Sequence, residues 1–149
     1  MKIILFSLLF ITFLMAQKPK EVLLLHSYHK GYIWSDDISK TIEKEFQNLE
    51  DIELTTVYMD TKRIADPIYL DQLAKLYKQQ FKKRNFDLII ASDNNAFDFA
   101  INYHEYLFKE LPVLFCGINN FDKAFLEQNY MKKYMTGVVE QVDLEKNFK

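Results

Sequence analysis

The sequence predicts an α/β domain: a three-layer, doubly wound fold around a mainly parallel five-stranded sheet. Short apolar runs alternate with amphipathic helical patterns in the order βαβαβαβαβ, and the connections are long enough for parallel crossovers. The run Leu88-Ile89-Ile90-Ala91 is apolar at every position, which is typical of a strand that is buried on both faces. Right-handed crossovers between such strands place helices on both sides of the sheet.

Composition limits the classes of function. The chain has 149 residues, 49% of them hydrophobic, which suits one domain with a sizeable core. Its formal net charge is −2 and its longest basic run is Lys82-Lys83-Arg84, so we expect no nucleic acid partner. The three glycines, at 31, 117 and 137, cannot form a glycine-rich phosphate loop. The single cysteine, Cys116, permits no internal disulfide.

Residues 1–16 have the pattern of a secretory signal peptide. Lys2 provides a positive start, an apolar block covers 3–15, and the small residue Ala16 suits a cleavage site. We therefore expect export and a periplasmic or other extracytoplasmic location. An uncleaved membrane anchor is the alternative, although the block is shorter than the roughly 20 residues that a spanning helix needs.

The first strand is predicted at 21–26, another continuous apolar run, and a loop containing Gly31 follows it. Ser35 is the predicted N-cap of the first helix, since its hydroxyl can accept a hydrogen bond from the helix start. Apolar residues three and four apart predict the buried face of that helix. They are Ile38, Ile42, Phe46 and Leu49.

The second strand is predicted at 52–59, where alternation of residue character suits an edge position. Asp66 is the predicted cap of the next helix, with Pro67 in its first turn and a helical pattern that continues to Arg84. After the strand at 88–91, a helix is predicted from about Asn95 to Phe108.

The remaining elements are shorter. A fourth strand is predicted at 112–116, a short helix at 121–128 and a fifth strand at 136–139. His104 falls in the predicted helix 95–108, and we expect it to be solvated.

Polar residues follow each predicted strand, and the carboxyl ends of parallel strands meet at one edge of a sheet. Ligands bind at that edge, near the point where the strand order reverses, which we expect between the first and third strands. The candidate ligand-binding residues are His26, Ser27, Tyr28, Trp34, Asp60, Arg63, Ser92, Asp93, Asn94, Asn95, Gly117, Asn119 and Glu140.

Most of these residues have a structural alternative. Ser92, Asp93 and Asn94 precede a helix and can serve only as its cap, and the aromatic residues around Gly31 can pack over the sheet end. Arg63 can pair with Asp60 or Asp66 instead of a ligand. The charge of Asp93 at the helix start should favour an ammonium or hydroxyl group over a phosphate, which suggests an amino acid or similar zwitterion.

The sequence favours no chemistry beyond binding. His26 and His29 are three residues apart but lack further ligands at a known spacing, so we expect no metal and no cofactor. No Ser, His and acid arrangement has the GxSxG turn of a hydrolase, so we name no catalytic residues and do not expect an enzyme.

Five segments together resemble a known family. They are 24–37 (LLHSYHKGYIWSDD), 58–63 (YMDTKR), 87–96 (DLIIASDNNA), 114–119 (LFCGIN) and 136–140 (TGVVE). In order and spacing they resemble periplasmic-binding-protein-like domains: the ABC transporter substrate-binding family that takes up tryptophan or tyrosine, and related sensor domains of bacterial histidine kinases and diguanylate cyclases. The resemblance runs from about Glu21 to Asn147.

The resemblance implies the N-terminal lobe of a type I periplasmic-binding-protein fold, with the ligand held between two lobes. Residues 17–140 would form this lobe and 141–149 would begin the crossover to a second one. The implied function is recognition of a small organic solute for ABC-type uptake or transmembrane signalling, with a membrane transporter or a sensor kinase or cyclase module as partner. The alternative is a truncated or self-associating remnant without independent ligand binding, with a homodimer as the self-associated form. An enzyme on the same fold is less favoured.

Overall fold

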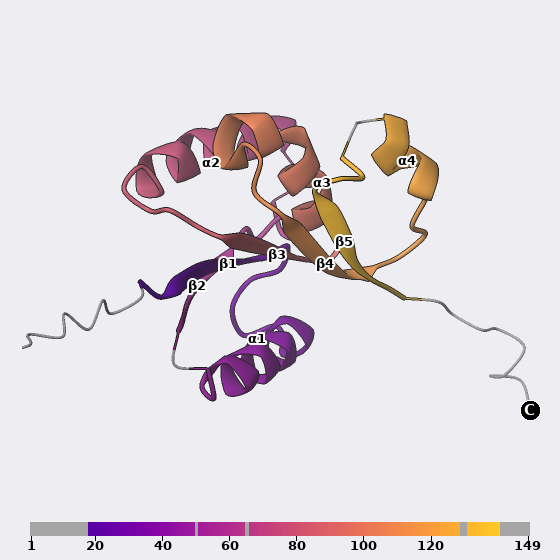
Figure 1. The fold of residues 1–149 in the computed structure, drawn as a ribbon. Coiled ribbons are helices and arrows are strands. Elements are labelled where there is room, and N and C mark those ends of the chain that lie inside the picture. The colour runs from indigo at the N-terminus through magenta and orange to yellow at the C-terminus, as the bar shows by residue number, and fades with distance from the viewer. Residues whose placement is uncertain (1–17, 50, 65, 129–130, 141–149) are drawn as a thin grey trace, which may run out of the picture.

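A computed structural model describes residues 18–49, 51–64, 66–128 and 131–140, and it contains the predicted parallel sheet (Figure 1). All neighbouring strands are parallel, in the order β2-β1-β3-β4-β5. The strands are β1 (Lys20–His26), β2 (Ile52–Tyr58), β3 (Leu88–Ser92), β4 (Val113–Ile118) and β5 (Met135–Val139). β2 lies at an edge, and the order reverses between β1 and β3, as the sequence predicted. The expected signal peptide (1–16) and crossover start (141–149) lie outside the described residues.

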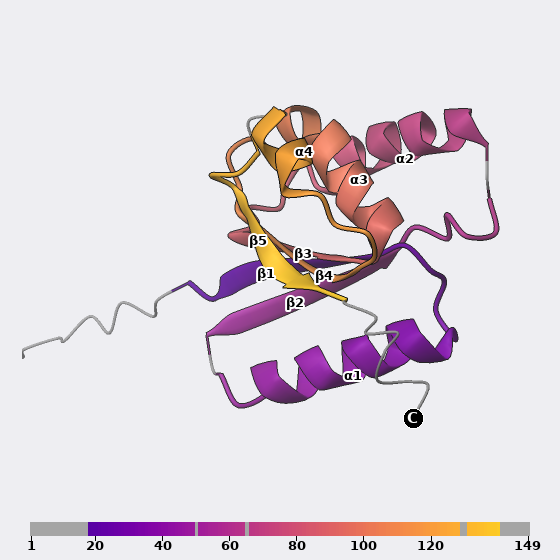
Figure 2. The same ribbon diagram turned by 90° about the vertical axis from the view of Figure 1, so that its right-hand side faces the viewer.

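Helices cover both faces of the sheet, which confirms the three-layer doubly wound fold. They are α1 (Ile33–Phe46), α2 (Pro67–Gln80), α3 (Asn94–Asn102), the π-helical η1 (His104–Phe108) and α4 (Lys123–Gln128). α1 lies on one face, and α2, α3 and α4 lie on the other (Figures 1 and 2). The chain steps from β1 to β2 in one direction and in the opposite direction thereafter, so right-handed crossovers change face once. None of the helices in the described ranges is long and apolar enough to cross a membrane.

The apolar runs are explained by burial on both faces. In β1, Leu23 and Leu25 face the larger core under α2 and α3, whereas Val22 and Leu24 face α1. Phe99 of α3 is fully buried in the larger core, where its ring contacts Tyr77 and Tyr103. Successive strand residues alternate between the two cores, so neither side of the strand meets water.

The face that carries α1 is only partly covered. Beside α1 lies an apolar hollow of about 680 Å³ whose lining includes Trp34, Ile42 and Phe46 of the helix and Leu114 and Val138 of the sheet. Leu114 is 36% exposed and Val138 is 70% exposed. Within the described residues, this part of the sheet therefore presents apolar side chains to solvent.

The start of α2 is as predicted, and the start of α1 is not. Asp66 Oδ1 accepts a hydrogen bond from Ile68 N at 2.8 Å, with Pro67 in the first turn. Ser35, in contrast, is not a cap but a buried residue inside α1, because the chain becomes helical three residues earlier than predicted. Gly31 (φ 93°) turns the chain, and its N–H donates to Asp36 Oδ1 at 3.1 Å.

Two further expectations about helices are wrong. Leu49 lies beyond the end of α1 and is 50% exposed, so it does not extend the buried face. His104 is buried rather than solvated, since its ring packs on Tyr134 and its Nε2 donates to the Leu111 carbonyl oxygen at 2.9 Å. The predicted helix 95–108 divides at Tyr103 into α3 and η1, and this division turns His104 inward.

Phe99→Ala should lower the free energy of unfolding by about 3–5 kcal/mol, because it leaves a cavity in the larger core. Val138→Ala, on the exposed face, should change it by less than about 0.5 kcal/mol. Urea unfolding followed by circular dichroism measures both. Equal losses for the two variants would contradict this assignment of the core.

Candidate functional site

The residues that follow the five strands meet at one edge of the sheet, which we call the rim. Backbone hydrogen bonds join neighbouring strand ends there: Met59 N donates to the His26 carbonyl at 2.8 Å, and Asp93 N donates to the Cys116 carbonyl at 3.0 Å. Glu140 N donates to the Ile118 carbonyl at 3.0 Å and ties the end of β5 to the same edge. The rim therefore brings together segments that are far apart in the sequence.

Three of the predicted ligand contacts form the buried support of the rim. His26, Ser27 and Ser92 have no exposed surface. His26 Nδ1 lies 3.0 Å from Ser92 Oγ, and its Nε2 lies 2.8 Å from Ser39 Oγ. These groups are satisfied inside the protein, so they hold the loops in place and present no polar atom to a solute.

Ser27 joins three segments through both its side chain and its backbone. Its Oγ donates to the Ser92 carbonyl at 3.1 Å and accepts from Ala96 N, in the first turn of α3, at 2.7 Å. Its carbonyl accepts from Thr61 N and Thr61 Oγ1, both at 2.9 Å. The loops after β1, β2 and β3 are thus fixed to one another.

Asp93 is the most constrained residue of the rim. Its backbone has φ 76° and ψ 162°, a region essentially reserved for glycine, and its carboxylate accepts from Asn95 N as the N-cap of α3. The same carboxylate is buried and lies 3.0 Å from Lys62 Nζ. The ammonium group that we expected Asp93 to attract is therefore supplied by the chain itself.

The asparagines lock the neighbouring loops. Asn94 Nδ2 donates to the Asn119 carbonyl at 3.0 Å, and Asn119 N donates to Asn94 Oδ1 at 3.1 Å. Asn95 Nδ2 donates to Thr61 Oγ1 at 2.9 Å. A hollow of about 260 Å³ lies beside Asn94 and Asn119, also bordered by Asp98. The hollow of about 520 Å³ shares no residue with the rim, whereas the hollow of about 680 Å³ reaches it at Trp34.

The aromatic residues after β1 divide into a packed residue and an open pair. Trp34 packs over Gly117 (φ 68°), where a Cβ atom would lie 2.6 Å from Trp34 Cη2 and 3.8 Å from Glu140 Oε1.

Tyr28 and Tyr32 form the open pair. Their rings stack with centroids 4.1 Å apart, and Tyr32 is 41% exposed. Lys62 Nζ lies 5.1 Å above the Tyr28 ring, whose pKa is raised by burial and by the charge of Asp93. The tyrosine pair offers a flat surface to solvent.

Asp60 and Arg63 form the internal pair that the sequence left as one of two alternatives. Arg63 Nε and Nη2 donate to the two Asp60 carboxylate oxygens at 2.7 and 2.5 Å, and these hydrogen bonds lower the pKa of Asp60. The guanidinium group remains exposed at the rim. Glu140 is also exposed, and its carboxylate lies near Gly117.

Sequence reasoning missed Lys62 and Thr61 as members of the site. Both lie between the named residues Asp60 and Arg63, and their position in this loop was the available signal. Across the described ranges, no group of three or more His, Cys, Asp or Glu side chains is placed to hold a metal ion. The rim offers hydrogen-bonding and stacking groups, and its charges are largely paired.

The backbone of Asp93 provides a test of strain at the rim. Asp93→Gly should be more stable than Asp93→Ala by about 1–2 kcal/mol, because both variants lose the carboxylate but only glycine adopts this conformation freely. Asp98, inside α3, is the matched control: there glycine should be less stable than alanine by about 1 kcal/mol. Urea unfolding of the four variants measures both differences, and the same sign at both positions would contradict the strain.

The buried His26 should make stability depend on pH. Burial lowers the pKa of His26 to about 4 from 6.5, against a smaller opposing effect of the Asp36 charge. The unfolded chain therefore binds the proton first, so this contribution is complete above about pH 6.5 and is lost as the pH falls towards about 4. The free energy of unfolding should fall by up to about 1.4 kcal/mol per pH unit in that window.

His26→Gln should remove most of this pH dependence, whereas His29→Gln, which keeps the buried imidazole, should retain it. Urea unfolding at several pH values from about 7 to about 4.5 measures the slopes. If His26→Gln and the parent chain have the same slope, the buried neutral imidazole is not its cause.

Comparisons of the chain with protein-family models, with curated proteins and with solved structures found no match.

Proposed function

We propose that this chain is an extracytoplasmic solute-binding lobe that recognises a small organic molecule at its rim. One observation carries the proposal: the loops after the strands meet at one edge of the sheet, and the strand order reverses there between β1 and β3. These loops carry the stacked Tyr28–Tyr32 pair and the Lys62–Asp93 ion pair. Crevices at this position of open α/β sheets are where ligands bind. The resemblance of five rim segments to periplasmic-binding-protein-like domains supports the same conclusion.

The pairing of charges favours a zwitterionic or neutral polar solute. Lys62 offsets Asp93, and Arg63 offsets Asp60, so neither pair demands a counter-ion from the ligand. Exposed donors and acceptors remain on Asn119, Arg63 and Glu140, and the Tyr28–Tyr32 pair can stack on a planar or apolar part. An amino acid, with its two opposite charges and a side chain, combines these features.

The shallowness of the rim supports a site that needs an opposing surface. Its hollow of about 260 Å³ lies below the roughly 300–1,000 Å³ of typical ligand pockets. In a two-lobe protein, hinge closure supplies the other half of the contacts. Loss of roughly 4 kcal/mol of contacts turns a micromolar site into a millimolar one. We therefore propose that a second lobe completes the site and that a transporter or a sensor kinase or cyclase module reads the closed state.

Self-association is the second candidate, and the apolar hollow beside α1 favours it. Leu114 and Val138 present a continuous apolar surface within the described residues, and such surfaces often mark interfaces. A homodimer through this face would cover Trp34 and leave the Tyr28–Tyr32 pair free. Light scattering of the purified chain, compared with Val138→Lys, distinguishes a dimer that the variant dissociates from a monomer.

The proposal predicts weak, rim-specific binding of amino acids. In ¹⁵N heteronuclear NMR titrations, a zwitterionic amino acid should shift signals of the rim with a Kd on the order of millimolar. Tyr32→Ala should weaken binding about three- to tenfold by removing the stacking surface. Tyr106→Ala is the control, since Tyr106 is 44% exposed but lies in η1, away from the rim.

Equal effects of the two tyrosine variants, or no shift at the rim for any of the standard amino acids, would contradict the proposed ligand class. A micromolar Kd for the isolated chain would contradict the need for a second lobe.

A further inference from the structure

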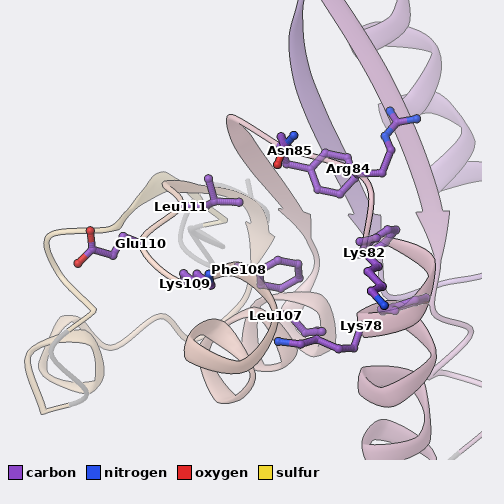
Figure 3. A pocket seen from close by; sticks show the side chains of 12 residues that line it. Lys78, Lys82, Arg84, Asn85, Leu107, Phe108, Lys109, Glu110 and Leu111 are labelled. Atoms are coloured by element: carbon purple, nitrogen blue, oxygen red, sulfur yellow. The ribbon is translucent and has the colours of Figure 1, made fainter.

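We propose a second binding site, at the opposite edge of the sheet from the rim, for an amphiphilic organic anion: an apolar ring or chain that ends in a carboxylate. The site is a pocket of about 520 Å³, which we call the amino-edge pocket, between the end of α2 and the end of η1 (Figure 3). Its volume is within the range of ligand pockets. The lining that matters here comprises Phe81, Phe86, Phe108, Lys78, Lys82 and Lys109.

The floor of the amino-edge pocket is apolar. Phe108 is buried, and the Phe81 ring meets Phe86 edge-on at 5.1 Å and stacks on Tyr77 at 5.3 Å. Leu107 and Leu111 extend this surface along η1 and the segment after it. These side chains suit the apolar part of a ligand, which burial would remove from water.

The polar part of the pocket is cationic. The one carboxylate in its lining, Glu110, points away from the phenylalanines and lies 3.5 Å from the Tyr134 hydroxyl, which donates to it (Figure 3). Arg84 lies over the Phe86 ring, with 5.6 Å between its guanidinium carbon and the ring centroid, but its charge is paired with Glu21 at 2.9 Å and Glu53 at 3.0 Å.

The lysines of the pocket have no such neutralising partners. Lys78 Nζ donates to the Tyr106 carbonyl, which anchors it beside the pocket. Among the residues that the structure describes, neither Lys82 nor Lys109 has an ion-pair partner. An anionic ligand would supply the missing charge.

The backbone at Lys109 is strained. Among the described residues, Asp60, Asp93 and Asn120 also have positive φ, and all three lie at the rim. Asp and Asn adopt the left-handed helical region more readily than lysine does, although Asp93 lies outside that region. Lys109 has φ 52° and ψ −119° at the opposite edge. Its N–H closes the π-turn by donating to the His104 carbonyl at 2.6 Å.

Both features of this segment are typical of functional positions. π-helical turns occur often at functional sites, and backbone strain persists where the surrounding structure enforces it. Here the buried His104, bonded to the Leu111 carbonyl at 2.9 Å, holds both ends of the turn. The turn keeps a long cationic side chain at the mouth of an apolar pocket.

These observations select the ligand class. A small inorganic anion would leave the partly exposed surfaces of Phe81, Leu107 and Leu111 in water, and a neutral apolar compound would leave the lysines without a counter-charge. An aryl or alkyl carboxylate satisfies both parts. Because the amino-edge pocket shares no residue with the rim, the inference is independent of the proposed function.

The probe is 2-naphthoate, with 2-naphthalenemethanol as its neutral counterpart, titrated into the ¹⁵N-labelled chain. The test variant is Lys82→Gln with Lys109→Gly, because glycine adopts the Lys109 backbone without strain and so preserves the fold. The control variant is Lys75→Gln with Lys83→Gln, which removes the same charge from exposed lysines outside the pocket lining.

We expect naphthoate to shift the signals of Phe86, Phe108 and their neighbours, and to bind more tightly than the alcohol. The test variant should bind naphthoate about tenfold more weakly, as expected from the loss of two charge contacts, and the control should stay within about twofold of the parent. Equal Kd values for the test and control variants would overturn the proposal. Shifts confined to the rim or to the hollow beside α1 would overturn it as well.

Discussion

The rim depends on the satisfaction of buried polar groups between β1 and β3. His26, Ser27 and Ser92 lie without solvent contact where the strand order reverses, so each must find a partner inside the protein. Ser27 binds the Ser92 carbonyl, Thr61 and the first turn of α3 at once. Loss of one of these bonds would leave a desolvated group and release two loops together. The surface groups of the rim depend on this buried network for their positions.

The two ends of the sheet present different chemistry on the same scaffold. At the rim, left-handed residues are Asp and Asn, and Lys62–Asp93 and Arg63–Asp60 balance their charges. At the opposite edge, a lysine takes the left-handed position beside an apolar floor. Paired charge suits a zwitterionic or neutral solute, whereas unpaired cations beside phenylalanine rings suit an amphiphilic anion. Because the ends are separated by the length of the strands, a ligand at one proposed site would leave the other free.

Much of the fold could be predicted because its signals are local or periodic. Apolar runs marked the strands, alternation marked β2 as an edge, and Asp66 with Pro67 marked the start of α2. The errors arose where tertiary contacts decided the outcome. Gly31 and Asp36 start α1 earlier than the Ser35 signal indicated, and a π-turn rotates His104 into the core. Neither effect has a local signature that outweighs the competing pattern.

The sequence by itself determined which residues reach the rim, because parallel strands bring their carboxyl ends to one edge. Only the tertiary structure decided which of them face solvent: Ser27 and Ser92 turn inward, Trp34 covers Gly117, and the Tyr28–Tyr32 pair stays open. It also decided that Lys62 pairs with Asp93. The physical reason is that topology follows from patterns along one chain, whereas burial and charge pairing depend on distances between side chains from different segments.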